Sequence, residues 1–168
     1  VVLDVRDIHG KDYRGVEILK GLSLKVRRGE IVGLAGVDGN GQTELVEILT
    51  GLRKGDSGQV LMNGKDLFNK RPREIFENGI TSIPADRQKH GLVLEFSVAE
   101  NLILQNYMKE PYSKKGVLKK DAIMAHAKEL VEKFDIRPKG SESRPAGTLS
   151  GGNQQKVIIA REITNNSD

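Results

Sequence analysis

A glycine-rich segment between an apolar run and a helical pattern is where residue types and spacing first suggest chemistry. Its eight residues read GVDGNGQT, with glycines at Gly36, Gly39 and Gly41. Glycines let a backbone wrap around an anion, and a helix that starts directly afterwards adds the partial positive charge of its N-terminus. The segment therefore predicts a loop that holds phosphate groups through backbone amides.

This segment matches the phosphate-loop consensus G-x-x-x-x-G-K-[ST] at both glycines and at Thr43, but Gln42 stands at the lysine position. A plain glycine-rich turn between a strand and a helix is the alternative interpretation. A dinucleotide-binding loop is disfavoured, because Glu44 stands where that motif needs its third glycine. The candidate phosphate-binding residues are Gly36, Asp38, Gly39, Asn40, Gly41, Gln42 and Thr43.

A second glycine motif opens another predicted helix much later in the chain. It reads LSGGNQ, and its residues are Leu149, Ser150, Gly151, Gly152, Asn153 and Gln154. The Ser150 hydroxyl and the two glycine amides would form a second helix start that favours an anion. The alternative is an ordinary helix that Ser150 caps after a glycine turn.

The elements that must position these loops alternate between strand and helix patterns. Residues 1–5 and 22–26 predict strands, and 31–35 is a short continuous apolar run. Such a run is typical of a strand buried on both faces of a parallel sheet. Residues 45–52 then repeat apolar side chains at helical spacing. The phosphate loop would thus join a buried strand to a helix, which indicates an α/β domain.

The remaining pattern supplies further elements. It predicts a strand over 60–65 that enters an Asn-Gly turn, a short helix after Pro72 and a strand over 80–84. Further along the chain it predicts a helix with a capping box at 97–100, an exposed lysine-rich loop over 109–120 and an amphipathic helix over 121–134.

Composition excludes several classes of function. The 168 residues contain no cysteine, which rules out disulfides, cysteine zinc sites and cysteine nucleophiles. The three histidines are scattered and form no local metal-ligand pair. A net charge of +4 is too small to indicate nucleic-acid binding without a clustered basic face. No apolar run approaches the roughly 20 residues of a membrane span, and no secretory leader opens the chain, so we expect an intracellular soluble domain.

The LSGGNQ motif resembles the signature sequence of ATP-binding cassette (ABC) ATPases, which usually reads LSGGQ. The resemblance covers the whole chain. It places Tyr13 as the aromatic residue that stacks on adenine, with an ordinary loop tyrosine as the alternative. Ala85 stands where the family has its Q-loop glutamine, so the chain lacks at this position the residue that usually links metal, water and membrane subunit.

One branch of this family is especially similar. Residues 86–93 and 96–102, together with Gln42 and Asn153, resemble the second, degenerate cassette of double-cassette ATPases that import simple sugars and nucleosides. The resemblance implies ATP and Mg²⁺ as cofactors, with Thr43 as the metal ligand. It also implies a second cassette in the same polypeptide, membrane-spanning permease subunits, a peripheral position on the cytoplasmic face of the membrane and no nucleic acid partner.

The implied fold is an α/β, P-loop NTPase-like nucleotide-binding domain with N-terminal antiparallel strands, a parallel core sheet and a helical segment. Residues 1–90 and 149–168 would form the nucleotide-binding core and 91–148 the helical segment. The Walker B aspartate, the general-base glutamate and the switch histidine of the family are not among the 168 residues. We therefore expect a fragment that stops before Walker B, lacks the later core strands and does not hydrolyse ATP alone.

Two other functions stay open at this stage. A soluble ABC-type ATPase acting on ribosomes or DNA has slight support from the four lysines of the 114–120 loop, whereas residues 86–101 favour transport. Salt-sensitive nucleic-acid binding would identify that class. A P-loop scaffold that binds no nucleotide is the other possibility, and nucleotide titration distinguishes it.

Overall fold

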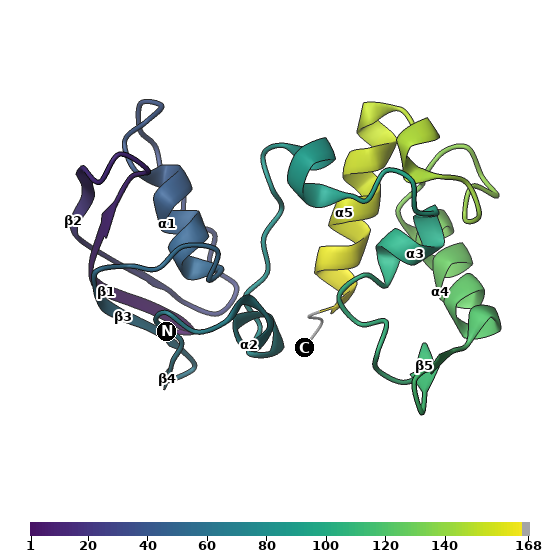
Figure 1. Ribbon diagram of the computed structural model, residues 1–168, viewed down its shortest axis with the longest axis horizontal. Helices are drawn as coiled ribbons and strands as arrows, with labels where there is room; N and C mark the ends of the chain where they lie inside the picture. The colour runs from purple at the N-terminus through teal and green to yellow at the C-terminus, as the bar shows by residue number, and fades with distance from the viewer. Residues whose placement is uncertain (166–168) are drawn as a thin grey trace. The chain divides into compact units, whose positions relative to one another are not determined.

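The chain forms two compact units, Val1–Ser82 and Ile83–Asp168, each with its own hydrophobic core (Figure 1). The computed structural model describes residues 1–165. No helix within that range is both long and apolar enough to cross a membrane.

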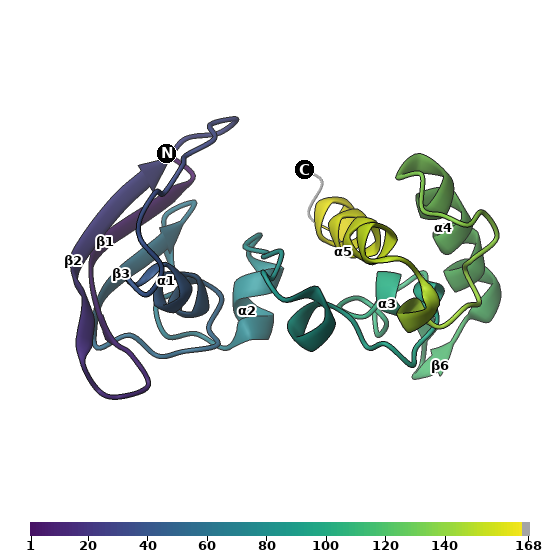
Figure 2. The same ribbon diagram turned by 90° about the horizontal axis from the view of Figure 1, so that it is seen from above.

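The first unit is a four-stranded antiparallel sheet with one face covered by a helix. Its elements are β1 (Leu3–Lys11), β2 (Glu17–Val26), α1 (Gln42–Leu49), β3 (Ser57–Met62), β4 (Lys65–Asp66) and α2 (Pro72–Glu77). The strand order is β2-β1-β3-β4, and Val5 in β1 pairs with Leu24 on one side and Val60 on the other. Leu45 and Ile48 of α1 pack on the sheet residues, which holds the helix against the sheet (Figure 2).

Several predictions for this unit are confirmed. Residues 1–5 and 22–26 lie mostly within β1 and β2, and α2 begins at Pro72. The Asn-Gly turn joins β3 to β4, with Asn63 and Gly64 both at positive φ, 48° and 83°. That geometry is the reason for an Asn-Gly pair in a tight hairpin.

The predicted strands over 31–35 and 80–84 are wrong, and so is the parallel sheet they would have formed within residues 1–165. Every strand pair in that range is antiparallel, and neither segment is paired. Ile31 is 97% exposed. A strand forms only where a neighbouring strand takes its backbone hydrogen bonds, and apolar side chains alone do not supply that neighbour.

The second unit is mainly helical. Its elements are the π-helical turn η1 (Arg87–Gly91), α3 (Val98–Leu102), the short strands β5 (Ser113–Lys114) and β6 (Val117–Leu118), α4 (Lys120–Lys133), the 3₁₀ turn η2 (Ala146–Thr148) and α5 (Gly151–Asn165). The predicted amphipathic helix is confirmed as α4, with Ile123, Ala127 and Leu130 buried. The lysine-rich loop differs from the prediction in containing the β5–β6 hairpin.

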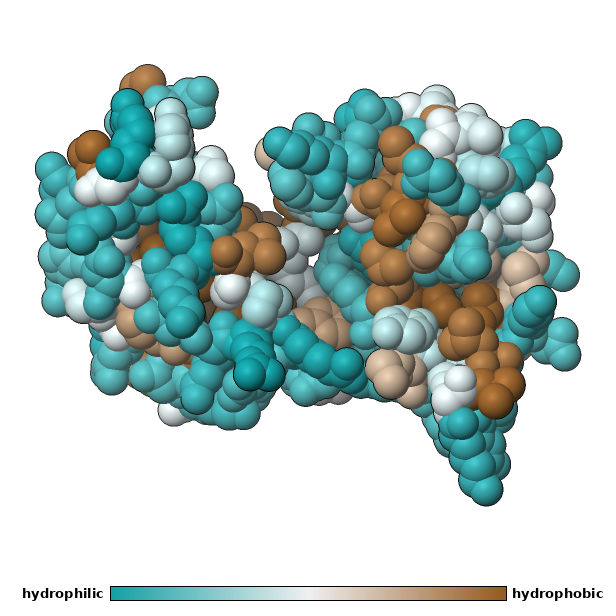
Figure 3. Space-filling view, viewed as in Figure 1, coloured by the Kyte–Doolittle hydropathy of each residue, from teal (hydrophilic) through white to brown (hydrophobic). Residues whose placement is uncertain are grey.

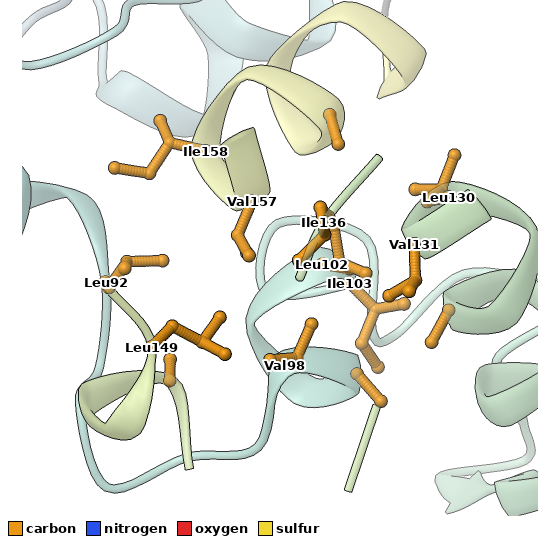
Figure 4. Close-up of a cluster of buried hydrophobic side chains, with 14 of the residues drawn as sticks. Leu92, Val98, Leu102, Ile103, Leu130, Val131, Ile136, Leu149, Val157 and Ile158 are labelled. Carbon is orange, nitrogen blue, oxygen red and sulfur yellow. The ribbon is translucent and has the colours of Figure 1, made fainter. Parts of the chain in front are cut away.

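Both the predicted capping box and the apolar faces of the helices shape this unit. Ser97 Oγ accepts from the Glu100 amide at 3.2 Å, and the Glu100 carboxylate accepts from the Ser97 amide at 2.7 Å. Leu149 and Val157 point into the same apolar cluster as Leu102 (Figure 4). That cluster therefore anchors both ends of the segment that carries the LSGGNQ motif. Hydrophobic side chains also remain at the surface over α5 (Figure 3), where Ile163 is 57% exposed.

Candidate nucleotide-binding loops

The phosphate loop ends in a helix start that is open to solvent. Residues 36–40 are exposed, and Gly41 precedes α1 with φ 96°, a left-handed conformation that suits glycine. The bond from the Leu45 amide to the Gly41 carbonyl, 2.9 Å, begins the helical hydrogen bonding. The amides of residues 41–44 therefore have no acceptor within the helix and are free to bind an anion.

The sheet fixes where this helix starts. A Cβ on Gly41 would lie 2.9 Å from Leu19 Cδ2 and 3.6 Å from the Ile18 carbonyl oxygen. Both neighbours belong to the beginning of β2, directly after the turn that carries Tyr13. The backbone of Gly41 can approach β2 this closely only because it has no side chain.

Gln42 folds back over the loop. Its Nε2 donates to the Val37 carbonyl oxygen at 3.4 Å, a weak bond, and its side chain lies against Gly36. A lysine at this position would bring a positive charge into the loop. The Gln42 amide is neutral, and its NH₂ group donates to the backbone instead. The loop therefore lacks one cationic contact. Its Asn40 amide donates to the Val37 carbonyl oxygen at 3.2 Å, but the amides of residues 41–44 remain available.

Tyr13 and Thr43 are accessible to a ligand, as a nucleotide site requires. Tyr13 is 87% exposed, with the Arg14 guanidinium 5.6 Å from its ring centroid. The Asp12 carboxylate holds the turn by accepting from the amides of Arg14 at 2.8 Å and Val16 at 3.0 Å. Asp38 and Asn40 are also exposed in the loop.

The side chains around the phosphate loop suit Mg²⁺ that is bound together with nucleotide phosphates better than a metal ion held by protein ligands alone. Within residues 1–165, no group of three His, Cys, Asp or Glu side chains could hold a metal ion. Mg²⁺ is commonly bound by one or two protein oxygens together with phosphates. The exposed Thr43 hydroxyl at the start of α1 suits that arrangement.

The LSGGNQ motif divides into buried and exposed members. Gln154 is 2% exposed, and its Nε2 donates to the carbonyl oxygens of Ala146 at 3.3 Å and Leu149 at 3.2 Å. Ser150 and Gly152 are exposed, and Asn153 Nδ2 donates to Ser150 Oγ at 2.8 Å. Gln154 therefore holds the loop from inside, while Ser150 is left at the surface.

The contact between η1 and the LSGGNQ motif was not predicted from the sequence. A Cβ on Gly151 would lie 2.5 Å from Arg87 Nη2, so the guanidinium lies against the start of α5. Arg87 Nε is buried and has no hydrogen-bond partner among residues 1–165. Gln88 Nε2 donates to Gln154 Oε1 at 3.3 Å. The sequence marked both residues through the resemblance of segment 86–93 to one branch of the family, but nothing in it indicated a contact with α5.

Asp86 fixes the position of η1. Its Oδ1 accepts from the amides of Lys89 at 3.0 Å and Gln88 at 3.1 Å. The bond from the Lys89 amide, more than any other contact, holds the pKa of the Asp86 carboxyl below its usual range. Asp86 is therefore ionised at neutral pH, and its cap orients Arg87 and Gln88 toward α5.

Replacing Gly41 with alanine tests the packing of the phosphate loop. We expect unfolding of the first unit to become easier by about 2 kcal/mol or more, from left-handed strain together with the clash at Leu19. Gly39→Ala is the matched control, because Gly39 also has a positive φ, 82°, but an added Cβ would meet nothing within 4 Å. Denaturant titration measures both. Equal losses of stability would show that the contact with Leu19 contributes nothing.

Comparison with known proteins identifies the family of this chain. A family model described as ABC transporter matches residues 19–168. The chain therefore belongs to the ABC transporter family.

Two relatives that are named for nucleoside or guanosine import are similar to this chain over nearly all of its length. The nucleoside import ATP-binding protein NupA of Lactococcus lactis is 56% identical over 168 residues, which are 100% of this chain and 33% of that protein. The guanosine import ATP-binding protein NupO of Bacillus subtilis is 54% identical over 167 residues, 99% of this chain and 32% of that protein. The chain spans about a third of the length of these relatives.

Solved structures confirm the fold class. A nucleotide-free ATP-binding cassette from an ABC transporter has a TM-score of 0.77 and 27% identity, covering 98% of this chain and 65% of that chain. The ADP conformation of an ABC transporter cassette has a TM-score of 0.73 with the same identity and coverage. The predicted α/β ABC domain is therefore confirmed.

Proposed function

We propose that this chain is the ATP-binding part of an ABC importer ATPase that couples ATP binding and hydrolysis to uptake of a simple sugar or a nucleoside. One observation carries the proposal: an exposed glycine loop ends in a helix start whose first amides are free, in a chain that also presents Ser150 before α5. The relatives named for nucleoside and guanosine import favour the nucleoside.

In this proposal each part of the first unit has a distinct role. The amides of Gly39 and of residues 41–43 hold the phosphates of ATP, and Tyr13 stacks on the adenine. Thr43 holds Mg²⁺ together with the phosphates. When bound, Mg²⁺ neutralises phosphate charge. Gln42 supplies a neutral donor in place of a cation, which makes this the weaker of two sites.

The second unit serves a different nucleotide. Ser150 and the amides of Gly151 and Gly152 cover ATP held by a second cassette in the same polypeptide, in the second position of a double-cassette ATPase. The intact protein works with membrane-spanning permease subunits at the cytoplasmic face of the membrane. Nucleic acid is not a partner in this assignment.

Calorimetric titration of the chain with Mg·ATP tests the proposal. We expect saturable binding that Thr43→Ala weakens about tenfold, because a hydroxyl that contacts a charged group is lost. Thr81→Ala removes a hydroxyl elsewhere in the first unit and should leave binding unchanged. Absence of binding would support the inert scaffold, and salt-sensitive binding of nucleic acid would support the alternative soluble ATPase.

A further inference from the structure

The β5–β6 hairpin projects from the second unit and belongs to neither glycine loop (Figure 1). Its turn is formed by Lys115 and Gly116, which have positive φ angles of 52° and 81°. Positive φ at both central residues is the geometry of a tight two-residue hairpin turn. Every residue from 114 to 120 is exposed. The hairpin therefore presents side chains of both its strands to its surroundings.

The base of this hairpin is fixed against α4. Ser113 is 6% exposed, and the ring centroid of Tyr112 lies 5.2 Å from that of His126 in α4. The Lys119 amide donates to the Tyr112 carbonyl oxygen at 2.8 Å, directly before α4 begins. The exposed tip is thus held in one position relative to α4.

Lysines give the hairpin a concentrated positive charge. Residues 111–120 contain four lysines and no acidic residue. These four equal the whole +4 excess of the chain, in which 27 basic residues face 23 acidic ones. In the part of the chain that the structure describes, Lys114, Lys115 and Lys119 form no ion pair. Their charges are therefore available to an anionic partner.

Apolar side chains lie at the surface among these lysines. Val117 and Leu118 of β6 are 69% and 50% exposed. Tyr107 and Met108, which precede the hairpin, are 47% and 59% exposed. In Figure 3, hydrophobic residues adjoin the hydrophilic projection of the second unit. The hairpin region thus combines positive charge with exposed apolar surface.

This combination favours a membrane over a nucleic acid as the partner. Lysines attract anionic lipid headgroups, and aliphatic side chains beside them can enter the boundary between headgroups and acyl chains. The phosphates of a nucleic acid would satisfy the lysines but would leave Val117 and Leu118 in water. Residues 104–136 also contain no arginine, the residue best suited to nucleic-acid recognition.

We propose that the β5–β6 hairpin binds the surface of an anionic lipid bilayer, with its lysines at the lipid phosphates and with Val117 and Leu118 at the acyl boundary. The inference rests on the proposed function, because a peripheral position at the cytoplasmic face of the membrane brings a bilayer within reach. It adds a direct contact with lipid to the contact with permease subunits.

Co-sedimentation of the chain with lipid vesicles tests this proposal. The vesicles contain equal parts of phosphatidylglycerol and phosphatidylcholine, and vesicles of phosphatidylcholine alone serve for comparison. At about 0.1 M salt, we expect binding to the anionic vesicles to be at least about tenfold tighter. Lys114→Gln with Lys115→Gln should weaken it roughly twentyfold, because each lysine near an anionic surface contributes roughly fivefold.

A matched pair of substitutions controls for net charge. Lys128→Gln with Lys133→Gln removes the same two charges from exposed positions of α4 and should change vesicle binding by less than about twofold. If both double variants lose affinity equally, general attraction explains the binding and the proposal is overturned. Equal binding to anionic and neutral vesicles, or no binding to either, would also overturn it.

Val117→Thr with Leu118→Thr tests the apolar contact while leaving every lysine in place. Vesicle affinity should fall about tenfold, because less apolar surface leaves water on binding. Melting temperatures show that each variant is folded. Unchanged vesicle affinity would overturn the proposal, as would double-stranded DNA binding that only the lysine variant weakens together with no preference for anionic vesicles.

Calorimetric titration of the same protein with Mg·ATP keeps the two proposals apart. A chain that binds ATP but not anionic vesicles would lose only the lipid contact. A chain that binds the vesicles through the hairpin but does not bind ATP would retain the lipid contact and would count against the proposed function.

Discussion

Replacing Gln42 with lysine is expected to tighten ATP binding about ten- to hundredfold, the worth of one hydrogen bond to a charged group. The amide now donates only a weak 3.4 Å bond to the Val37 carbonyl, so little is lost when it leaves. The new ammonium would reach the β- and γ-phosphates, while the backbone amides continue to bind as before. ADP, which lacks the γ-phosphate, should gain less than ATP.

Calorimetric titration of both proteins with both nucleotides measures this change. Gln59→Lys is the control, because it adds the same charge to an exposed position of β3 in the same unit. A Gln42→Lys protein that binds neither nucleotide more tightly would show that the loop does not cradle phosphates. A gain shared with Gln59→Lys would show long-range attraction instead of a contact.

Replacing Ser150 with arginine in the double-cassette ATPase that we propose is expected to lower ATPase activity by about a hundredfold or more, as when a donor to the reacting phosphates is removed. Ser150 is exposed before α5 and lines a cavity of about 460 Å³, so arginine would fill the space that the nucleotide enters in the proposed function. The melting temperature should change little, because losing a cap costs only about 1 kcal/mol.

Steady-state ATPase rates and thermal unfolding, measured on the same protein, separate blockage from unfolding. Ser143→Arg places an equal charge on an exposed position of the same unit and should leave the rate unchanged. A fall in melting temperature that parallels the lost activity would favour the simple capping role of Ser150. Normal activity would remove Ser150 from the nucleotide-contacting surface.

Local sequence determined the parts of this protein that need only nearby residues. The Asn63-Gly64 hairpin, the capping box of Ser97 and Glu100, and the amphipathic pattern of α4 all formed where they were predicted. Each depends on contacts within a few residues, which sequence spacing records directly. For the same reason the two glycine loops before α1 and α5 were found from sequence, because their glycines permit the turns from which the helices start.

Only the tertiary structure decided which distant residues meet those loops. Arg87 lies against Gly151 and Asn153 bonds the Arg137 amide, although no periodic pattern in the sequence connects either pair. The apolar run over 31–35 had the composition of a buried strand, yet Ile31 is 97% exposed because no strand within residues 1–165 pairs with it. Pairing and docking depend on contacts between segments far apart in the chain, and local composition and spacing carry no record of them.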